Sequence, residues 1–127
     1  MQALKPGFWY MASPYSHPSA YVRDARARAA RDATYGALRQ GYVCFSPIHA
    51  THDIAVAHSL PKDAEWWKQY NARYLDAAAG VIVLMLDGWR ESVGVKWEIE
   101  YADRSPYPLP VLYMDPTTGV IRETIDG

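Results

Sequence analysis

The six residues from Val81 to Leu86 are all apolar, and no other segment of the chain constrains the fold as strongly. A strand that is exposed on one face alternates apolar and polar residues, whereas a strand covered on both faces reads as a continuous apolar run. A Gly/Ser-containing turn and a helical pattern follow this run. The order predicts a buried strand of a parallel sheet that leads into a helix.

Strand and helix patterns alternate along the rest of the chain, which predicts an α/β fold with a parallel sheet of four to five strands and helices on both faces. We expect strands at 8–12, 42–45, 81–86 and 108–114, with a short edge strand within 117–122. Helices are expected at about 19–40, from Pro61 to about 78, and after Ser92, and residues 48–60 form a loop or a short helix.

The first helix has an alanine-rich stripe, and Gly41 is placed to end it. The residues expected to face the sheet are Val22, Ala25, Ala29, Ala33 and Ala37.

Length and composition limit the class of protein. The 127 residues suffice for one domain, which we expect to span 1–127, and half of them are apolar. A net charge of −1 gives no electrostatic reason to expect nucleic acid or a membrane as partner. The single cysteine, Cys44, cannot form an internal disulfide, and no segment resembles a signal peptide or a membrane span. We therefore expect a cytoplasmic protein.

Ligands of such sheets bind at the carboxyl ends of the strands, where the connections diverge. Three separate segments meet there: the loop at 13–17 after the first strand, the segment at 46–52 after the second, and the helix start at Ser92. The candidate contacts to a small molecule are Ser13, Ser16, His17, Ser46, His52, Ser92 and Gly94.

The helix that begins near Ser92 combines an anion site with a carboxylate. Its free backbone N–H groups and the positive end of its dipole favour a phosphate-sized anion. Glu98 lies one turn after Gly94 and one turn before Ala102, among small residues on one helix face. Such a glutamate is either solvated on the surface or used for chemistry on a nucleotide or sugar phosphate.

Two further polar side chains stand in apolar surroundings. Asn71 interrupts a stripe that contains Trp67, Leu75 and Ala78, so its amide needs a partner, which is a ligand, Glu98 or backbone. Tyr10 ends the first strand, with either a core role or a phenol that faces the cleft.

Metal and cofactor signals are weak. His49, His52 and His58 are close in sequence, but no CxxC or HExxH pattern accompanies them. The chain also has no GxGxxG and no GxxxxGK[ST] pattern. We expect neither a metal nor a cofactor.

Four motifs together resemble the nucleoside 2-deoxyribosyltransferase-like superfamily over about residues 8–114. They are Tyr10-Met-Ala-Ser-Pro14, Phe45-Ser-Pro47, Asn71-x3-Leu75 and, the most specific, Ser92-x-Gly94-x3-Glu98-x3-Ala102. The resemblance implies a single three-layer domain with a small flavodoxin- or Rossmann-like sheet. It also implies homodimers or higher homo-oligomers that complete each other's sites.

The resemblance assigns roles to individual residues. Glu98 matches a catalytic glutamate that attacks the anomeric carbon, and Tyr10 matches a tyrosine that positions it. Serine at position 92 resembles the enzymes that hydrolyse the N-glycosidic bond of nucleoside 5′-monophosphates, whereas transferases often carry Asp there. The implied activity is hydrolysis of a (deoxy)nucleoside 5′-monophosphate. The alternatives are base exchange between deoxynucleosides and nucleotide binding without catalysis.

The chain departs from the pattern at two positions. Asn71 stands where relatives commonly carry an Asp that protonates the departing base, and an amide cannot deliver that proton. Pro14 stands where the hydrolases have a phosphate-binding serine, so Ser13 or Ser16 would substitute for it.

Overall fold

The computed structural model describes residues 1–126, and Gly127, the last residue of the expected domain, lies outside the described residues. The elements follow the predicted alternation. They are β1 (Trp9–Ala12), α1 (Ala20–Arg39), β2 (Cys44–Phe45), α2 (Pro47–Ala57), α3 (Ala64–Ala77), β3 (Gly80–Leu84), α4 (Val93–Arg104), β4 (Val111–Met114) and β5 (Ile121–Arg122).

The strands form one sheet in the order β2-β1-β3-β4-β5. The first four strands are parallel, and β5 pairs antiparallel with β4 at the edge. The predicted α/β fold with a small flavodoxin- or Rossmann-like sheet is confirmed, although the sheet is mostly rather than wholly parallel. From β1 the chain crosses to β2 on one side, whereas the later crossovers lead to β3 and β4 on the other side, so the connections diverge around β1 and β3.

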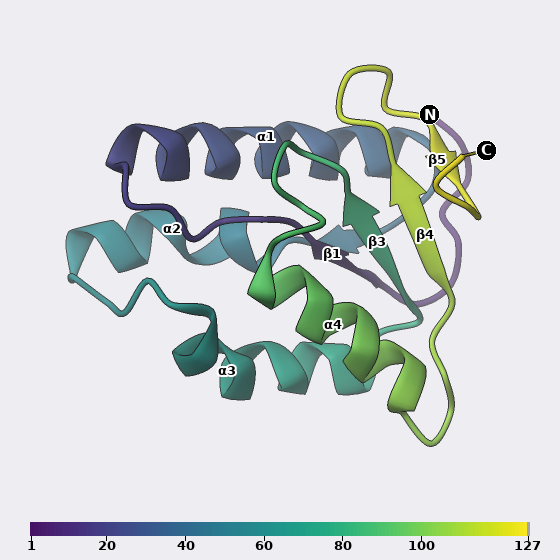
Figure 1. The fold of residues 1–127 in the computed structure, drawn as a ribbon. Helices are drawn as coiled ribbons and strands as arrows, with labels where there is room; N and C mark the ends of the chain where they lie inside the picture. The colour runs from purple at the N-terminus through teal and green to yellow at the C-terminus, as the bar shows by residue number, and fades with distance from the viewer. Residues whose placement is uncertain (127) are drawn as a thin grey trace.

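Helices cover both faces of the sheet (Figure 1). Met11 and Ile82 face α1, where they pack with Ala33 and Ala37. The residues on either side of Met11 and Ile82 along their strands point to the other face, which α3 and α4 cover. All five residues of β3 are buried, as the uninterrupted apolar run predicts.

Capping residues set the helix boundaries. Residues 48–60, predicted as a loop or short helix, are mostly α2, which the Ser46 side chain caps. The prediction that a helix begins at Pro61 was wrong by three residues, because the Asp63 carboxylate accepts a hydrogen bond from Trp66 N (2.9 Å) and α3 starts at Ala64.

The alanine stripe of α1 was predicted only in part. Ala33 and Ala37 are buried as expected, but Ala27 and Ala30 are buried in place of Ala25 and Ala29. Alanines lie on several faces of this helix, and packing against the sheet determines which of them are buried. Gly41 ends α1 with a φ of +91°, a conformation that favours glycine.

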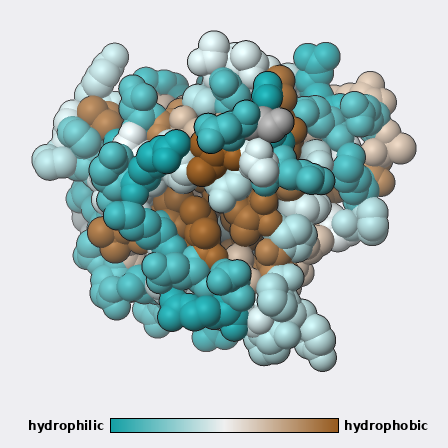
Figure 2. All heavy atoms as spheres, turned by 45° about the vertical axis from the view of Figure 1, so that its right-hand side comes forward, coloured by the Kyte–Doolittle hydropathy of each residue, from teal (hydrophilic) through white to brown (hydrophobic). Residues whose placement is uncertain are grey.

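The surface of the protein is mixed in polarity. Figure 2 shows hydrophobic side chains gathered near the middle of one face and surrounded by hydrophilic ones. Within residues 1–126, no helix has both the length and the apolar character needed to cross a membrane.

Candidate active site

A cavity of about 580 Å³ lies at the carboxyl ends of the parallel strands, where the segments after β1, β2 and β3 meet α3. Pockets for small organic ligands are typically of this size. The predicted convergence of three distant segments therefore produces one site.

Most of the residues predicted from the sequence are brought together here, and three are not. The cavity is lined by Ser13, Ser16, His52, Asn71, Ser92, Gly94 and Glu98, whereas Tyr10, His17 and Ser46 are not part of its wall.

Glu98 is the carboxyl group buried in the wall. It is 5% exposed, and the Tyr10 phenol donates a hydrogen bond to its Oε2. Burial raises the pKa of Glu98 from 4.5 to about 8, and the phenol hydrogen bond opposes that rise. Glu98 is therefore neither solvated nor paired with a cation, which disfavours a surface role.

Tyr10 lies in the core beneath Glu98. It is the second residue of β1, so the prediction that it ends the strand was wrong, and it is fully buried, which is the core placement rather than the cleft-facing one of the two considered. Burial first, and then the neighbouring Glu98 carboxylate, raise the pKa of Tyr10 well above its usual value. Tyr10 therefore stays a phenol that donates to Glu98 and fixes its position from behind.

Ser92 caps α4 at the cavity. Its Oγ accepts a hydrogen bond from Val95 N (3.2 Å), which leaves the hydroxyl proton free to be donated to a ligand. The N–H groups of Val93 and Gly94 belong to the first helical turn, where no acceptor exists within the helix. Hydroxyl, amides and helix dipole together are suited to bind an anion.

Two buried polar atoms of the wall have no partner among residues 1–126: Ser13 Oγ and Asn71 Oδ1. An unsatisfied buried acceptor costs about 1–3 kcal/mol. Of the partners considered for Asn71, neither Glu98 nor backbone bonds its Oδ1, so this acceptor in the cavity wall is free to accept a hydrogen bond.

His17 and Ser46 have local structural contacts instead of facing the cavity. His17 is exposed and its Nδ1 accepts a hydrogen bond from Ser19 N (3.0 Å), which orders the entry to α1. Ser46 Oγ accepts from His49 N (3.1 Å) and caps α2.

The lining residues not anticipated from the sequence include Tyr15, Arg26 and Trp97. Arg26 donates to Ser16 O (3.0 Å) and Asp87 O (3.3 Å), so it ties the loop after β1 to the loop after β3. In the sequence Arg26 is one of several arginines away from the alanine stripe, and nothing local distinguishes it. Tyr15 lies in a loop already predicted to face the ligand, and Trp97 directly precedes Glu98.

The described residues contain no cluster of possible metal ligands. Across the described part of the chain, no three His, Cys, Asp or Glu side chains lie close enough to hold an ion. Cys44 is mostly buried, and burial raises the pKa of its thiol to about 12, so it stays protonated.

Comparison with known proteins places the chain in a family. Residues 7–114 match a family described as a domain of unknown function (DUF1937), and the chain belongs to that family. No curated protein matches the chain.

The burial of Glu98 predicts a pH-dependent cost to stability. Between about pH 4.5 and pH 8, Glu98 is protonated in the folded protein but ionised in the unfolded chain. As the pH increases through this range, the group therefore lowers the free energy of unfolding by up to about 1.4 kcal/mol per pH unit. We expect Glu98→Gln, which does not titrate, to be more stable than the native protein by several kcal/mol at pH 8 and by much less at pH 5. Chemical denaturation at both pH values measures this.

The matched control is Glu100→Gln, on the exposed side of the same helix, where Glu100 pairs with Arg104. It should show no such increase. An advantage of Glu98→Gln that is equal at pH 5 and pH 8 would mean that the carboxyl group is not desolvated.

Proposed function

We propose that the protein hydrolyses the N-glycosidic bond of a (deoxy)nucleoside 5′-monophosphate and gives free base and sugar phosphate. The main support for this proposal is the placement of Glu98, which is buried in the cavity wall and held by Tyr10. Glu98 lies one and a half turns along α4, and the capped start of this helix is the proposed anion site. The likeness of the four motifs to the nucleoside 2-deoxyribosyltransferase-like superfamily supports the same proposal.

In the proposed reaction the Glu98 carboxylate attacks the anomeric carbon, the bond to the base breaks, and a glycosyl ester forms. Water then hydrolyses the ester. The Tyr10 hydrogen bond holds one carboxylate oxygen and leaves the other for attack. Because the site is desolvated, the carboxylate is poorly hydrated and therefore a stronger nucleophile than a surface glutamate.

The start of α4 is the proposed phosphate site. Ser92 donates its hydroxyl proton and the first-turn amides add two donors, while Arg26 contributes positive charge to the same cavity. Ser13, whose hydroxyl is buried without a partner, and Ser16 are the further candidates from the loop after β1.

Two other functions use the same residues. Base exchange differs only in whether a second base outcompetes water, and the serine at position 92 favours the hydrolase because an Asp there would repel a phosphate. A nucleotide-binding protein without turnover is favoured by Asn71, whose amide has no proton to give to a departing base.

Wider expectations on assembly, location and partners belong to the same proposal. The chain would act as a homodimer or higher homo-oligomer in the cytoplasm on a small nucleotide or nucleoside, with no nucleic acid, membrane or cofactor involved. A single cysteine with a buried, protonated thiol is compatible with a reducing compartment.

The first prediction is a substrate pattern. Among nucleosides and their 5′-monophosphates, we expect free base to be released only from monophosphates, and Glu98→Gln to lower that release at least a thousandfold because it removes the nucleophile. Chromatography of the released base measures this, with Glu100→Gln as the active control. Tight nucleotide binding by the native protein without any base release would favour the binding function instead.

A second prediction concerns pH. The 4-nitrophenyl glycoside of the preferred sugar 5-phosphate loses a leaving group that needs no proton, so its cleavage reports on the nucleophile alone. Because the pKa of Glu98 is raised to about 8, the carboxylate forms as the pH increases through that value, and kcat/KM should rise about tenfold from pH 7 to pH 9. A rate that decreases over this range would show that Glu98 acts as an acid.

A third prediction tests the phosphate site with Ser92→Asp. Aspartate caps helices as well as serine does, so α4 should keep its start, but the carboxylate repels a phosphate dianion. We expect the dissociation constant for a nucleoside 5′-monophosphate to increase by about a hundredfold or more and that for the matching nucleoside not to increase, as measured by isothermal titration calorimetry. Ser19→Asp, at the capped start of α1 outside the cavity, is the matched control. Equal losses of affinity for the monophosphate and the nucleoside would argue against a phosphate at Ser92.

A further inference from the structure

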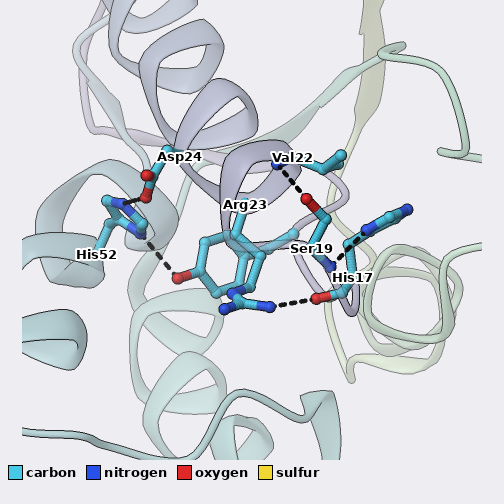
Figure 3. A network of polar contacts seen from close by, with 7 residues as sticks. His17, Ser19, Val22, Arg23, Asp24 and His52 are labelled. Carbon is cyan, nitrogen blue, oxygen red and sulfur yellow. Dashed lines mark hydrogen bonds and ion pairs between the residues drawn. The ribbon is translucent and has the colours of Figure 1, made fainter.

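Tyr15, His52 and Asp24 form a continuous hydrogen-bonded chain. The Asp24 carboxylate on α1 lies 2.8 Å from His52 Nε2 on α2, and His52 Nδ1 lies 2.8 Å from the phenol oxygen of Tyr15. Figure 3 shows Asp24 and His52 facing each other from the two helices, with Arg23 nearby. The loop after β1, α1 and the more distant α2 thus bring together a phenol, a carboxylate and the two ring nitrogens of His52.

This chain leads from the surface to the cavity. The Asp24 side chain is 50% exposed, the His52 side chain only 11%, and both Tyr15 and His52 line the cavity that contains Glu98. Arg23 donates to the backbone carbonyls of His17 and Pro18, which fixes the loop that carries Tyr15.

The bonding fixes which atoms carry protons. A carboxylate only accepts, so His52 Nε2 carries a proton toward Asp24. When His52 is neutral, its Nδ1 accepts from the Tyr15 hydroxyl. When His52 is protonated, Nδ1 donates to the Tyr15 oxygen, and the phenol proton is free to point at a ligand. Burial raises the pKa of Tyr15 despite the nearby positive Arg23, so the phenol keeps its proton.

The other polar side chains of the cavity wall are poorer candidates for the proton donor. The Asn71 amide cannot deliver a proton, and the Lys62 side chain is exposed to solvent. Asp63 accepts the capping hydrogen bond of α3, Glu65 pairs with Lys68, and Glu91 is exposed to solvent. Tyr15 is the one neutral O–H of the wall that is connected to a histidine and a carboxylate.

We propose that Tyr15, His52 and Asp24 are the proton relay that protonates the departing base, an inference that rests on the hydrolysis proposed above. Tyr15 touches the base, whereas His52 and Asp24 act through it as positioning and relay residues. The relay takes over the task that the amide of Asn71 cannot perform.

The proton balance closes over one turnover. As Glu98 attacks, the electron pair of the C–N bond goes to the base nitrogen, which takes the proton of the Tyr15 hydroxyl. The Tyr15 oxygen takes a proton from His52 Nδ1, and His52 is left neutral with its Nε2 proton bonded to Asp24. When water attacks the glycosyl ester, Glu98 leaves as carboxylate, and the proton lost by water returns through Tyr15 to His52.

The topology places the relay on the correct side. Because β1 lies between β2 and β3, the segments that follow β2 and β3 flank its carboxyl end. A phosphate at the start of α4, after β3, therefore directs the base across β1 toward α2, where His52 lies.

A leaving-group comparison tests the relay. Tyr15→Phe should lower kcat/KM for the nucleoside 5′-monophosphate by about a hundredfold or more, the usual contribution of general acid catalysis, because the base then leaves unprotonated. Cleavage of the 4-nitrophenyl sugar 5-phosphate, which needs no proton, should change by less than about threefold. His52→Gln should show the same selective loss, and this second variant serves as the test if Tyr15→Phe does not fold.

Tyr21→Phe is the matched control, since Tyr21 is an exposed phenol on α1, and it should leave both rates unchanged. Equal losses for both substrates in Tyr15→Phe, or no loss for either, would overturn the relay while the hydrolysis still stands. A native protein that cleaves neither substrate would overturn the hydrolysis and the relay with it. Relay failure and failure of the proposed function therefore give different results.

Discussion

A carboxyl group withdrawn from water is the constraint around which this site is built. Glu98 points from α4 toward the sheet, and the Tyr10 phenol of β1 is the donor that holds it. Desolvation favours the neutral acid, while the phenol favours the carboxylate. A helix that needed only to cover the sheet would place an apolar side chain here, so the folded state accepts a cost in stability for a buried carboxyl group.

The position of the cavity follows from chain topology. The connections after β1 and β3 lead away from each other, and the space between them is lined by loops and helix starts instead of by strand side chains. Capping side chains then set where these helices begin. Ser92 and Asp63 each lie in the cavity wall, so helix capping and the lining of the site depend on the same side chains.

The polar groups of the wall divide into those already bonded and those free for a ligand. Arg26 is used to join two loops and Tyr15 is bonded to His52, whereas Ser13 and Asn71 have buried oxygens without partners. This distribution agrees with a ligand that offers hydrogen-bond donors on one side and negative charge on the other, as a nucleoside monophosphate does. In the proposed hydrolysis the amide at position 71 supplies no proton, and the Asp24–His52–Tyr15 chain would supply it.

Periodicity and capping signals in the sequence by themselves determined the α/β alternation, the buried central strand and the meeting of three loops, because these depend on local pattern and on the fixed handedness of crossovers. They also singled out Ser92, Asn71 and Glu98 by spacing along a helix. The tertiary structure alone decided that His17 and Ser46 face away from the cavity, that Tyr10 lies beneath Glu98, and that Asp24 and Tyr15 meet through His52. Those outcomes depend on the rotation and distance between helices, which are set by side-chain packing between segments far apart in sequence.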